Sequence, residues 1–178
     1  MINWNAIIVE AHGTAILKGW WDKPVTQASQ LCNLHCELSE AFQEYRNGHE
    51  INEIYCKAAG CGNALICKER CEDYQPMGVP VELADFCLWV CDWMGNGRYE
   101  YIPTLISANV SGFDALISCL HKEVERIKVS GDESFTLCAM LDIAEAYCIR
   151  HHIPLKAALL QKMEYNRKRP YRHGGKRV

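Results

Sequence analysis

Two short segments of the chain carry paired carboxylates at the same spacing of three residues. Glu37 and Glu40 form one pair, and Glu82 and Asp85 form the other. Residues three apart lie on one face of an α-helix, so each pair presents two carboxylates one turn apart. Two such helices packed together would bring four negative charges to one point, where their repulsion favours a bound cation. Mg²⁺ prefers oxygen ligands and keeps several waters, so it suits carboxylates together with substrate phosphates.

A solvated acidic face is the alternative interpretation of these four residues. Apolar residues flank both acids of the second pair, which indicates a largely buried helix. Unpaired acids would be costly there, and this favours the metal site. Glu44 lies one turn beyond Glu40 and Asp92 lies two turns beyond Asp85. Either of these further acids could help to hold another ion.

A basic face near the carboxyl end of the chain has the chemistry of a phosphate site. Lys162, Asn166 and Arg169 are spaced at i, i+4 and i+7, so they share one side of a predicted helix. The planar fork of an arginine suits a phosphate, and a lysine supplies a point charge. The alternative is a basic helix end that complements the helix dipole.

Two adjacent tryptophans, Trp20 and Trp21, follow the glycine that is expected to end the first helix. Tryptophans in an exposed turn could stack on a nucleobase, as aromatic side chains do with unstacked bases. The alternative is that one of them, Trp21 in particular, fills the core.

Residues 49–79 form a long insertion rich in cysteine and glycine. Four of its cysteines could hold a structural Zn²⁺ tetrahedrally and tie down a segment that lacks a core of its own. An iron–sulfur cluster is a less favoured occupant. The spacing lacks the C-x2-C knuckle of common zinc sites, and the alternative is unligated cysteines that pack as small apolar residues. The four candidates are Cys56, Cys61, Cys67 and Cys71.

The composition is that of a globular chain, with 178 residues, 49% of them apolar and 23% charged. These values favour one domain over residues 1–178 and exclude wholesale disorder. Eleven cysteines are an odd number in a chain too long to need disulfides, so we expect reduced thiols in a cytoplasmic protein. No basic segment precedes an apolar run at the start, and no run approaches the length of a membrane span. The sequence therefore predicts neither a signal peptide nor a membrane partner.

Charge is distributed unevenly along the chain. The net charge is −3, but the last 18 residues carry seven lysines and arginines against one acid, which leaves the rest at −9. The acidic body argues against a general nucleic-acid-binding surface and suits a site that gathers carboxylates. A metal-stapled nucleic-acid-binding protein that uses the cysteine segment and the basic tail at residues 170–178 is thus the least favoured hypothesis.

Helical periodicity dominates the sequence and predicts an all-α bundle. Residues that cap or break helices set the expected bounds, with Thr26 as an N-cap and a capping box at Ser111. Pro170 and Gly174-Gly175 are expected to end the ordered pattern. The expected helices cover approximately residues 4–18, 26–46, 80–95, 111–128, 132–152 and 154–169.

A faint internal repeat also runs through the helices. Residues 34–37 (LHCE) resemble 120–123 (LHKE), and residues 82–85 (ELAD) resemble 142–145 (DIAE). Two degenerate copies of a helical hairpin would pack as a pseudo-dimer, and chance similarity between acidic helices is the alternative. Arg126 stands where the first copy has its second glutamate, so the second copy is expected to lack a metal site.

Taken together, these segments resemble the MazG-like branch of the all-α nucleoside triphosphate pyrophosphohydrolases. That family has a Glu-x-x-Glu helix followed by a Glu-x-x-Asp helix, which the two acidic pairs match. Three further stretches resemble the same branch, and they are residues 18–22 (KGWWD), 40–48 (EAFQEYRNG) and 162–175 (KMEYNRKRPYRHGG). The chain departs from the family in the 41 residues between Glu40 and Glu82, where the cysteine-rich insertion makes the separation longer than usual.

The resemblance implies a MazG-type bundle that hydrolyses a nucleoside triphosphate between its α and β phosphates, giving the monophosphate and pyrophosphate. It implies Mg²⁺, with Mn²⁺ as a substitute, and Glu40 as the carboxylate that orients the attacking water. It leaves the base, the sugar and the subunit number open, with a homodimer as one arrangement. A nucleotide-binding module that does not hydrolyse is the alternative. The implied metal ligands are Glu37, Glu40, Glu82 and Asp85, and the implied substrate contacts are Lys162, Asn166, Arg169, Trp20 and Trp21.

Overall fold

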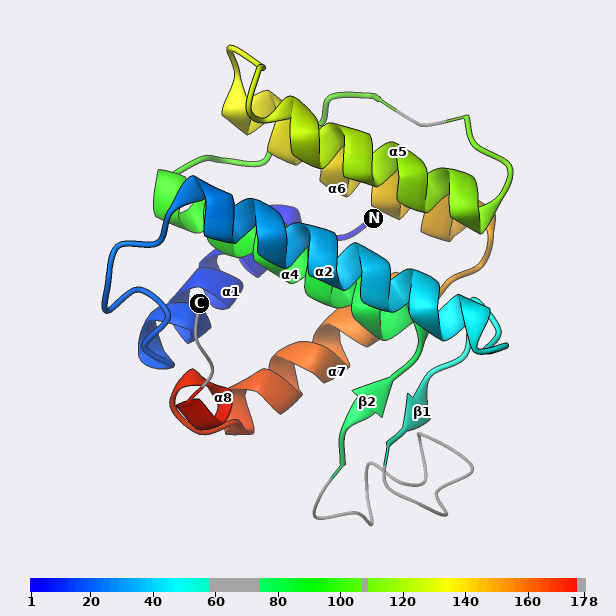
Figure 1. The fold of residues 1–178 in the computed structure, drawn as a ribbon, viewed down its shortest axis with the longest axis horizontal. Coiled ribbons are helices and arrows are strands. Elements are labelled where there is room, and N and C mark those ends of the chain that lie inside the picture. Colours follow the sequence, from blue (N-terminus) through cyan, green and yellow to red (C-terminus); the bar gives the residue numbers. More distant parts are fainter. Residues whose placement is uncertain (58–73, 107–108, 176–178) are drawn as a thin grey trace.

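The computed structural model describes residues 1–57, 74–106 and 109–175, which form seven helices and one small ribbon (Figure 1). In this part of the chain the all-α class is confirmed, and the two short strands are the exception. Strands β1 (Tyr55–Cys56) and β2 (Pro76–Met77) pair antiparallel within the insertion. The helices are α1 (Trp4–Leu17), α2 (Gln27–Arg46), α4 (Val79–Gly97), α5 (Phe113–Arg126), α6 (Glu133–Arg150), α7 (Leu155–Lys168) and α8 (Arg172–Gly175).

Side-chain caps fix three of the helix starts that the sequence predicts, those of α1, α2 and α6. The Thr26 side chain accepts a hydrogen bond from the Ser29 backbone N–H and begins α2, and Asp132 begins α6 in the same way. The predicted capping box at Ser111 is wrong, because α5 begins from Gly112, which has no side chain to accept a hydrogen bond.

Pro170 follows the end of α7 at Lys168, and the chain continues from it into α8, which ends at Gly175, the second of the two glycines predicted with Pro170 to end the ordered pattern. There the Arg172 backbone N–H donates to the carbonyl of Lys18 at 2.9 Å, and the Tyr171 hydroxyl donates to Asp22 at 2.5 Å. Gly19 is required at this contact, since its φ is +78° and a Cβ there would lie 2.0 Å from the Tyr171 ring. The carboxyl-terminal segment is thereby attached to the turn that follows α1.

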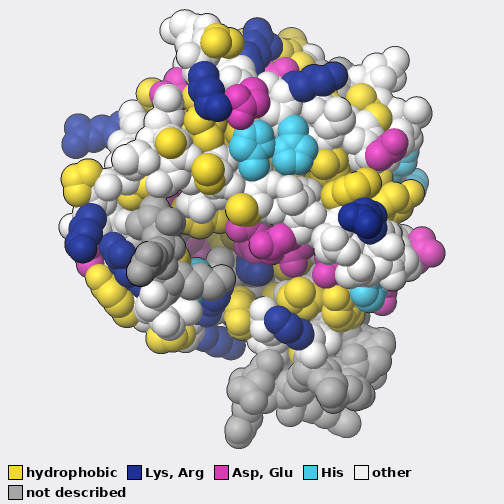
Figure 2. All heavy atoms as spheres, viewed as in Figure 1, with side chains coloured by type: hydrophobic (Ala, Val, Ile, Leu, Met, Phe, Trp, Pro, Cys, Tyr) yellow, Lys and Arg dark blue, Asp and Glu magenta, His cyan; other side chains and the backbone are white. Residues whose placement is uncertain are grey.

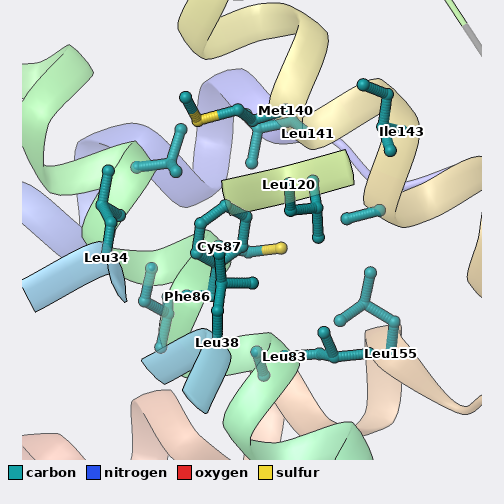
Figure 3. Packing of buried hydrophobic residues seen from close by; sticks show 14 of the residues in the cluster. Leu34, Leu38, Leu83, Phe86, Cys87, Leu120, Met140, Leu141, Ile143 and Leu155 are labelled. Carbon is teal, nitrogen blue, oxygen red and sulfur yellow. The ribbon is translucent and has the colours of Figure 1, made fainter. Parts of the chain in front are cut away.

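Helix α4 lies at the centre of the bundle and contacts α1, α2, α6 and α7. In Figure 1, α2 and α5 run side by side in opposite directions in the front layer, with α4 and α6 behind them. Figure 3 shows leucines of α2 meeting Leu83 and Phe86 of α4, with Leu120 of α5 and Leu141 of α6 completing the core. Within the described ranges, no helix is long and apolar enough to cross a membrane.

The two copies of the predicted repeat meet at a pair of histidines. His35 in α2 and His121 in α5 each lie eight residues after the first residue of their helix. Their rings stack with centroids 5.0 Å apart, and their Nδ1 atoms are separated by 2.7 Å. Contact between equivalent residues is what a two-fold axis between α2 and α5 would produce.

The acids of the second copy hold the connection between helices in place. Asp142 accepts hydrogen bonds from the Tyr101 hydroxyl and from the backbone N–H and hydroxyl of Thr104, at 2.7 and 2.6 Å for the last two. Glu145 accepts from the Ile2 backbone N–H and the Trp4 indole, both at 2.7 Å. These structural roles, which sequence spacing did not suggest, account for both carboxylates.

Adjacent leucines on α7 test how this helix is held against α4. Leu159 is 1% exposed and Leu160 is 53% exposed. We expect Leu159→Ala to lower the free energy of unfolding by about 2 to 5 kcal/mol through loss of buried contacts and cavity formation. Leu160→Ala, with the same chemical change on the same helix, is expected to stay within about 0.5 kcal/mol of the parent. Urea titrations followed by circular dichroism measure both, and equal losses would contradict the packing of α7.

Candidate functional site

Three of the four predicted metal ligands come together where α2 packs on α4. Glu37, Glu40 and Glu82 each place a carboxylate oxygen within 4.8 Å of the other two. Glu82 is buried, Glu37 is half-buried and Glu40 is exposed, so the cluster reaches from the core to the surface. Figure 2 shows acidic side chains gathered at the middle of this face, beside a hollow.

The fourth predicted ligand, Asp85, forms an ion pair with Lys162. The Lys162 ammonium lies 2.5 Å from Asp85 Oδ2, and the lysine is only 6% exposed. Thus a predicted metal ligand and a predicted phosphate contact bind each other. A buried ammonium requires such a partner, and four neighbouring carboxylates require a countercharge.

Burial and mutual repulsion raise the pKa values of the clustered acids. The pKa of Glu37 rises to about 9, chiefly because of burial and then because of Asp85 and Glu40. The pKa of Glu82 rises to about 8 through burial and Asp85, although Lys162 opposes the rise. Burial by itself would lower the pKa of Lys162, but Asp85 and Glu82 outweigh it and the pKa is raised. The cluster therefore favours either protons or a cation.

The donor set fits a hard divalent cation. Its three grouped side chains offer only carboxylate oxygens, and the fourth acid, Asp85, lies on the same helix one turn from Glu82. The exposure of Glu40 leaves one side of the group open to a substrate. Glu44 and Asp92 do not join this group. Glu44 accepts from the Tyr55 hydroxyl at 2.8 Å, and Asp92 pairs with other residues described below.

A cavity of about 140 Å³ opens beside the acids, lined by residues of α1 and the turn after it, α2, α4, α7 and α8. A cavity of this size accommodates a ligand of the size of a single aromatic ring. Glu37 and Asp85 lie at one part of its wall, and Trp20 and Trp89 contribute aromatic surface, edge to face, with centroids 6.0 Å apart. The Trp89 indole donates to Glu37 at 3.0 Å, which joins the aromatic wall to the acidic cluster.

The basic face predicted on α7 contributes to the same cavity. Asn166 and Arg169 both line it. The Asn166 Oδ1 atom is buried and has no hydrogen-bond partner among the described residues, so a ligand with a donor group could satisfy it. The Arg169 guanidinium lies over the Tyr165 ring at 5.4 Å, and its carbonyl accepts from Lys18 at 2.6 Å.

The two tryptophans predicted to stack on a base, Trp20 and Trp21, lie in different environments. Trp20 is buried and lines the cavity, with the His173 ring edge-on at 5.2 Å. Trp21 is absent from the cavity lining, and its indole N–H donates to Asp92 Oδ1 at 2.9 Å. His12 Nδ1 contacts the same oxygen at 2.7 Å. Burial raises the pKa of Asp92, whereas the hydrogen bonds from His12 and Trp21 lower it.

Several cavity residues did not stand out in the sequence. Trp89, four residues after Asp85 and therefore on the same helix face, carried a signal that spacing could have found. Lys18 and His173 line the cavity from residues 18–22 and 162–175, where no role was predicted for them, and His12 contacts the cavity residue Asp92. Their positions depend on how α1 and the carboxyl-terminal turn are attached.

Only one of the four predicted zinc ligands lies among the described residues. Cys56 is buried on β1 with 4% exposure. The remaining three, Cys61, Cys67 and Cys71, lie outside the described residues, so the zinc site stays a prediction.

Known proteins do not help to interpret this site. No protein-family model, curated protein or solved structure matches the chain. The family resemblance of the motifs therefore stays a prediction.

The raised pKa values predict that the metal-free protein loses stability as the pH rises. The folded state keeps protons on Glu37 and Glu82 that the unfolded chain releases above its ordinary pKa of 4.5, so unfolding is favoured by increasing pH up to about 9. Urea midpoints measured in chelator should fall between pH 6 and pH 9, and Glu37→Gln should reduce that fall.

Glu123 provides the matched control for this measurement. It occupies the position in α5 that corresponds to Glu37 in α2, and it pairs with Arg126 at 3.4 Å. The Glu123→Gln variant should keep the parent's pH dependence. A midpoint that rises with pH, or an equal fall in the Glu37→Gln variant and the parent, would contradict the raised pKa values.

Proposed function

We propose that the protein is a Mg²⁺-dependent nucleoside triphosphate pyrophosphohydrolase with a MazG-type bundle built from two degenerate hairpin copies. The observation that supports the proposal is the position of the acidic cluster relative to the cavity. The acidic cluster of α2 and α4 lies beside a cavity whose walls also contain Trp20, Asn166 and Arg169. Residues 18–22 and 162–175, which resemble the family, meet each other at this cavity. Four separate sequence features thus converge on one place.

Glu37, Glu40 and Glu82, with Asp85 beside them, are the residues that would hold the metal. When bound, Mg²⁺ or Mn²⁺ would neutralise the charge that develops on the phosphates and lower the pKa of a water. Glu40 is the exposed member of the cluster, so it is placed to orient a water and accept its proton. That water would attack the α-phosphorus, and the bond to the β-phosphate oxygen would break to release pyrophosphate.

Lys162 in α7 and Arg169, the C-cap residue that follows this helix, would contact the phosphates. Lys162 already faces the acids and is nearly buried, so its charge lies where the negative phosphates would approach. Arg169 lines the open cavity with its guanidinium supported by Tyr165. Asn166 lies between them on the same helix face, and its unpaired Oδ1 would accept from a sugar hydroxyl.

A nucleotide-binding module that does not hydrolyse is the second candidate. One observation favours it, because Asp85 contacts Lys162 and does not join the group formed by Glu37, Glu40 and Glu82. The same pocket would then hold a nucleotide without completing the metal site.

The deciding experiment compares the activity of two glutamate-to-glutamine variants, one at Glu40 in α2 and one at Glu123 in α5. Pyrophosphate and monophosphate are measured from a panel of ribo- and deoxynucleoside triphosphates, with Mg²⁺ and with chelator. We expect metal-dependent release, and we expect Glu40→Gln to lower kcat by about 100-fold or more because the water loses its base. Glu123→Gln, the control from α5, should retain the parent's rate.

Circular dichroism confirms that each variant is folded. Mg²⁺-dependent nucleotide binding by calorimetry without product from any substrate would support the binding module. Unchanged turnover in the Glu40→Gln variant would remove that residue from the assigned site.

A further inference from the structure

Asp92 lies on the same side of α4 as Asp85, two turns further along. Seven residues separate them, which corresponds to about 10 Å along the helix axis. Both residues line the cavity, with Leu88 and Trp89 between them. A nucleoside monophosphate has a comparable length from its 5′ phosphate to the far edge of its base. A nucleotide with its phosphates at the acidic cluster would therefore place its base edge near Asp92.

The two carboxylate oxygens of Asp92 have different partners. Oδ1 accepts from both His12 Nδ1 and the Trp21 indole, at 2.7 and 2.9 Å. Within the described residues, Oδ2 has no hydrogen-bond partner. Asp92 is 6% exposed and lines the cavity, so Oδ2 is available to accept a hydrogen bond from a ligand there. Burial raises the pKa of Asp92, and the hydrogen bonds from His12 and Trp21 oppose that rise by favouring the ionised form, in which Oδ2 is an acceptor.

The surrounding wall restricts what that donor can be. Trp20, Trp89 and Leu88 supply aromatic and apolar surface beside Asp92, which suits the faces of a flat ring. His12 and Trp21, the two donors closest to Asp92, are both directed at Oδ1. The complementary ligand is therefore a flat ring with an N–H donor at its edge.

We propose that Asp92 selects nucleobases with an exocyclic amino group, as in cytosine and adenine, over the corresponding oxo bases, uracil and hypoxanthine. This inference rests on the proposed function, because it assigns the base to the inner part of the same cavity. An amino group projects beyond the ring and donates to Oδ2. In the same ring orientation an oxo group would place its oxygen against the carboxylate, where two acceptors repel. The ring N–H of the oxo bases lies further back from Oδ2 than the projecting amino group does.

Matched substrate pairs test the selection in the unmodified protein. Cytidine and uridine triphosphates differ by an amino or oxo group at one ring position, and adenosine and inosine triphosphates differ in the same way. We expect kcat/KM for pyrophosphate release with Mg²⁺ to favour the amino member of each pair on the order of 10- to 100-fold, the range of one hydrogen bond to a charged group. Equal values within both pairs would overturn the proposal.

An Asp92→Asn variant changes the hydrogen-bonding character of the free atom. With its oxygen retained by His12 and Trp21, the amide presents an N–H₂ donor where Oδ2 was, so the preference should shift toward the oxo member of each pair. Asp142→Asn is the control, since Asp142 in α6 makes hydrogen bonds with Thr104 far from this cavity in sequence and contact. Its amino-to-oxo ratio should equal the parent's. An unchanged ratio in a folded Asp92→Asn variant would also overturn the proposal.

Binding measurements separate this inference from the proposed reaction. Trp20 and Trp89 line the cavity, so their fluorescence reports on titrations with cytidine and uridine monophosphates. Tighter binding of the cytidine compound, without hydrolysis of any triphosphate, would retain the base selection and reject the proposed enzyme. Hydrolysis with equal binding of both monophosphates and equal kcat/KM would retain the enzyme and reject the selection. Binding of neither compound at millimolar concentration, with no preference in turnover, would also reject it.

Discussion

The Lys162 ammonium lies 2.5 Å from Asp85 Oδ2, and the lysine is almost inaccessible to water. A charge in such a place is tolerated only when it is paired, and removal of one partner leaves the other uncompensated. Asp85 belongs to α4, the central helix, which also carries the buried Glu82 and Asp92. The structure compensates each acid differently. The charge of Asp85 is balanced by Lys162, and Asp92 accepts hydrogen bonds from two donors. The raised pKa of Glu82 favours its uncharged form.

This requirement explains why the outer helices are attached as they are. For Lys162 to reach Asp85, α7 must pack closely on α4, and buried residues such as Leu159 and Met163 on α7 supply that contact. For His12 to reach Asp92, α1 must pack on α4 from another side. The carboxyl-terminal turn then joins α7 to the end of α1 through Arg172 and Lys18. The cavity is the space that these contacts leave between the helices.

Local signals predicted the helices and the acidic pairs well. The Thr26 cap and the three-residue spacing of the acids depend on neighbours in sequence, so local patterns could identify them. The ion pair between Asp85 and Lys162 joins residues 77 positions apart, and Asp92 meets His12 across 80. Such contacts depend on how helices pack, and they leave no periodic trace. For this reason Asp92 was interpreted as a further metal ligand.

The two sets of corresponding acids show why the first copy is the better candidate for chemistry. In the second copy, Asp142 and Glu145 receive hydrogen bonds from Thr104, Trp4 and neighbouring groups, which satisfy both carboxylates and fix the chain around them. Arg126 lies beside Glu123 and supplies a positive charge where the first copy has Glu40. In the first copy the grouped acids raise one another's pKa values, and one lysine compensates them only in part. An arrangement of this kind costs stability in the free protein, and a cation with a phosphate ligand is the partner that would recover it.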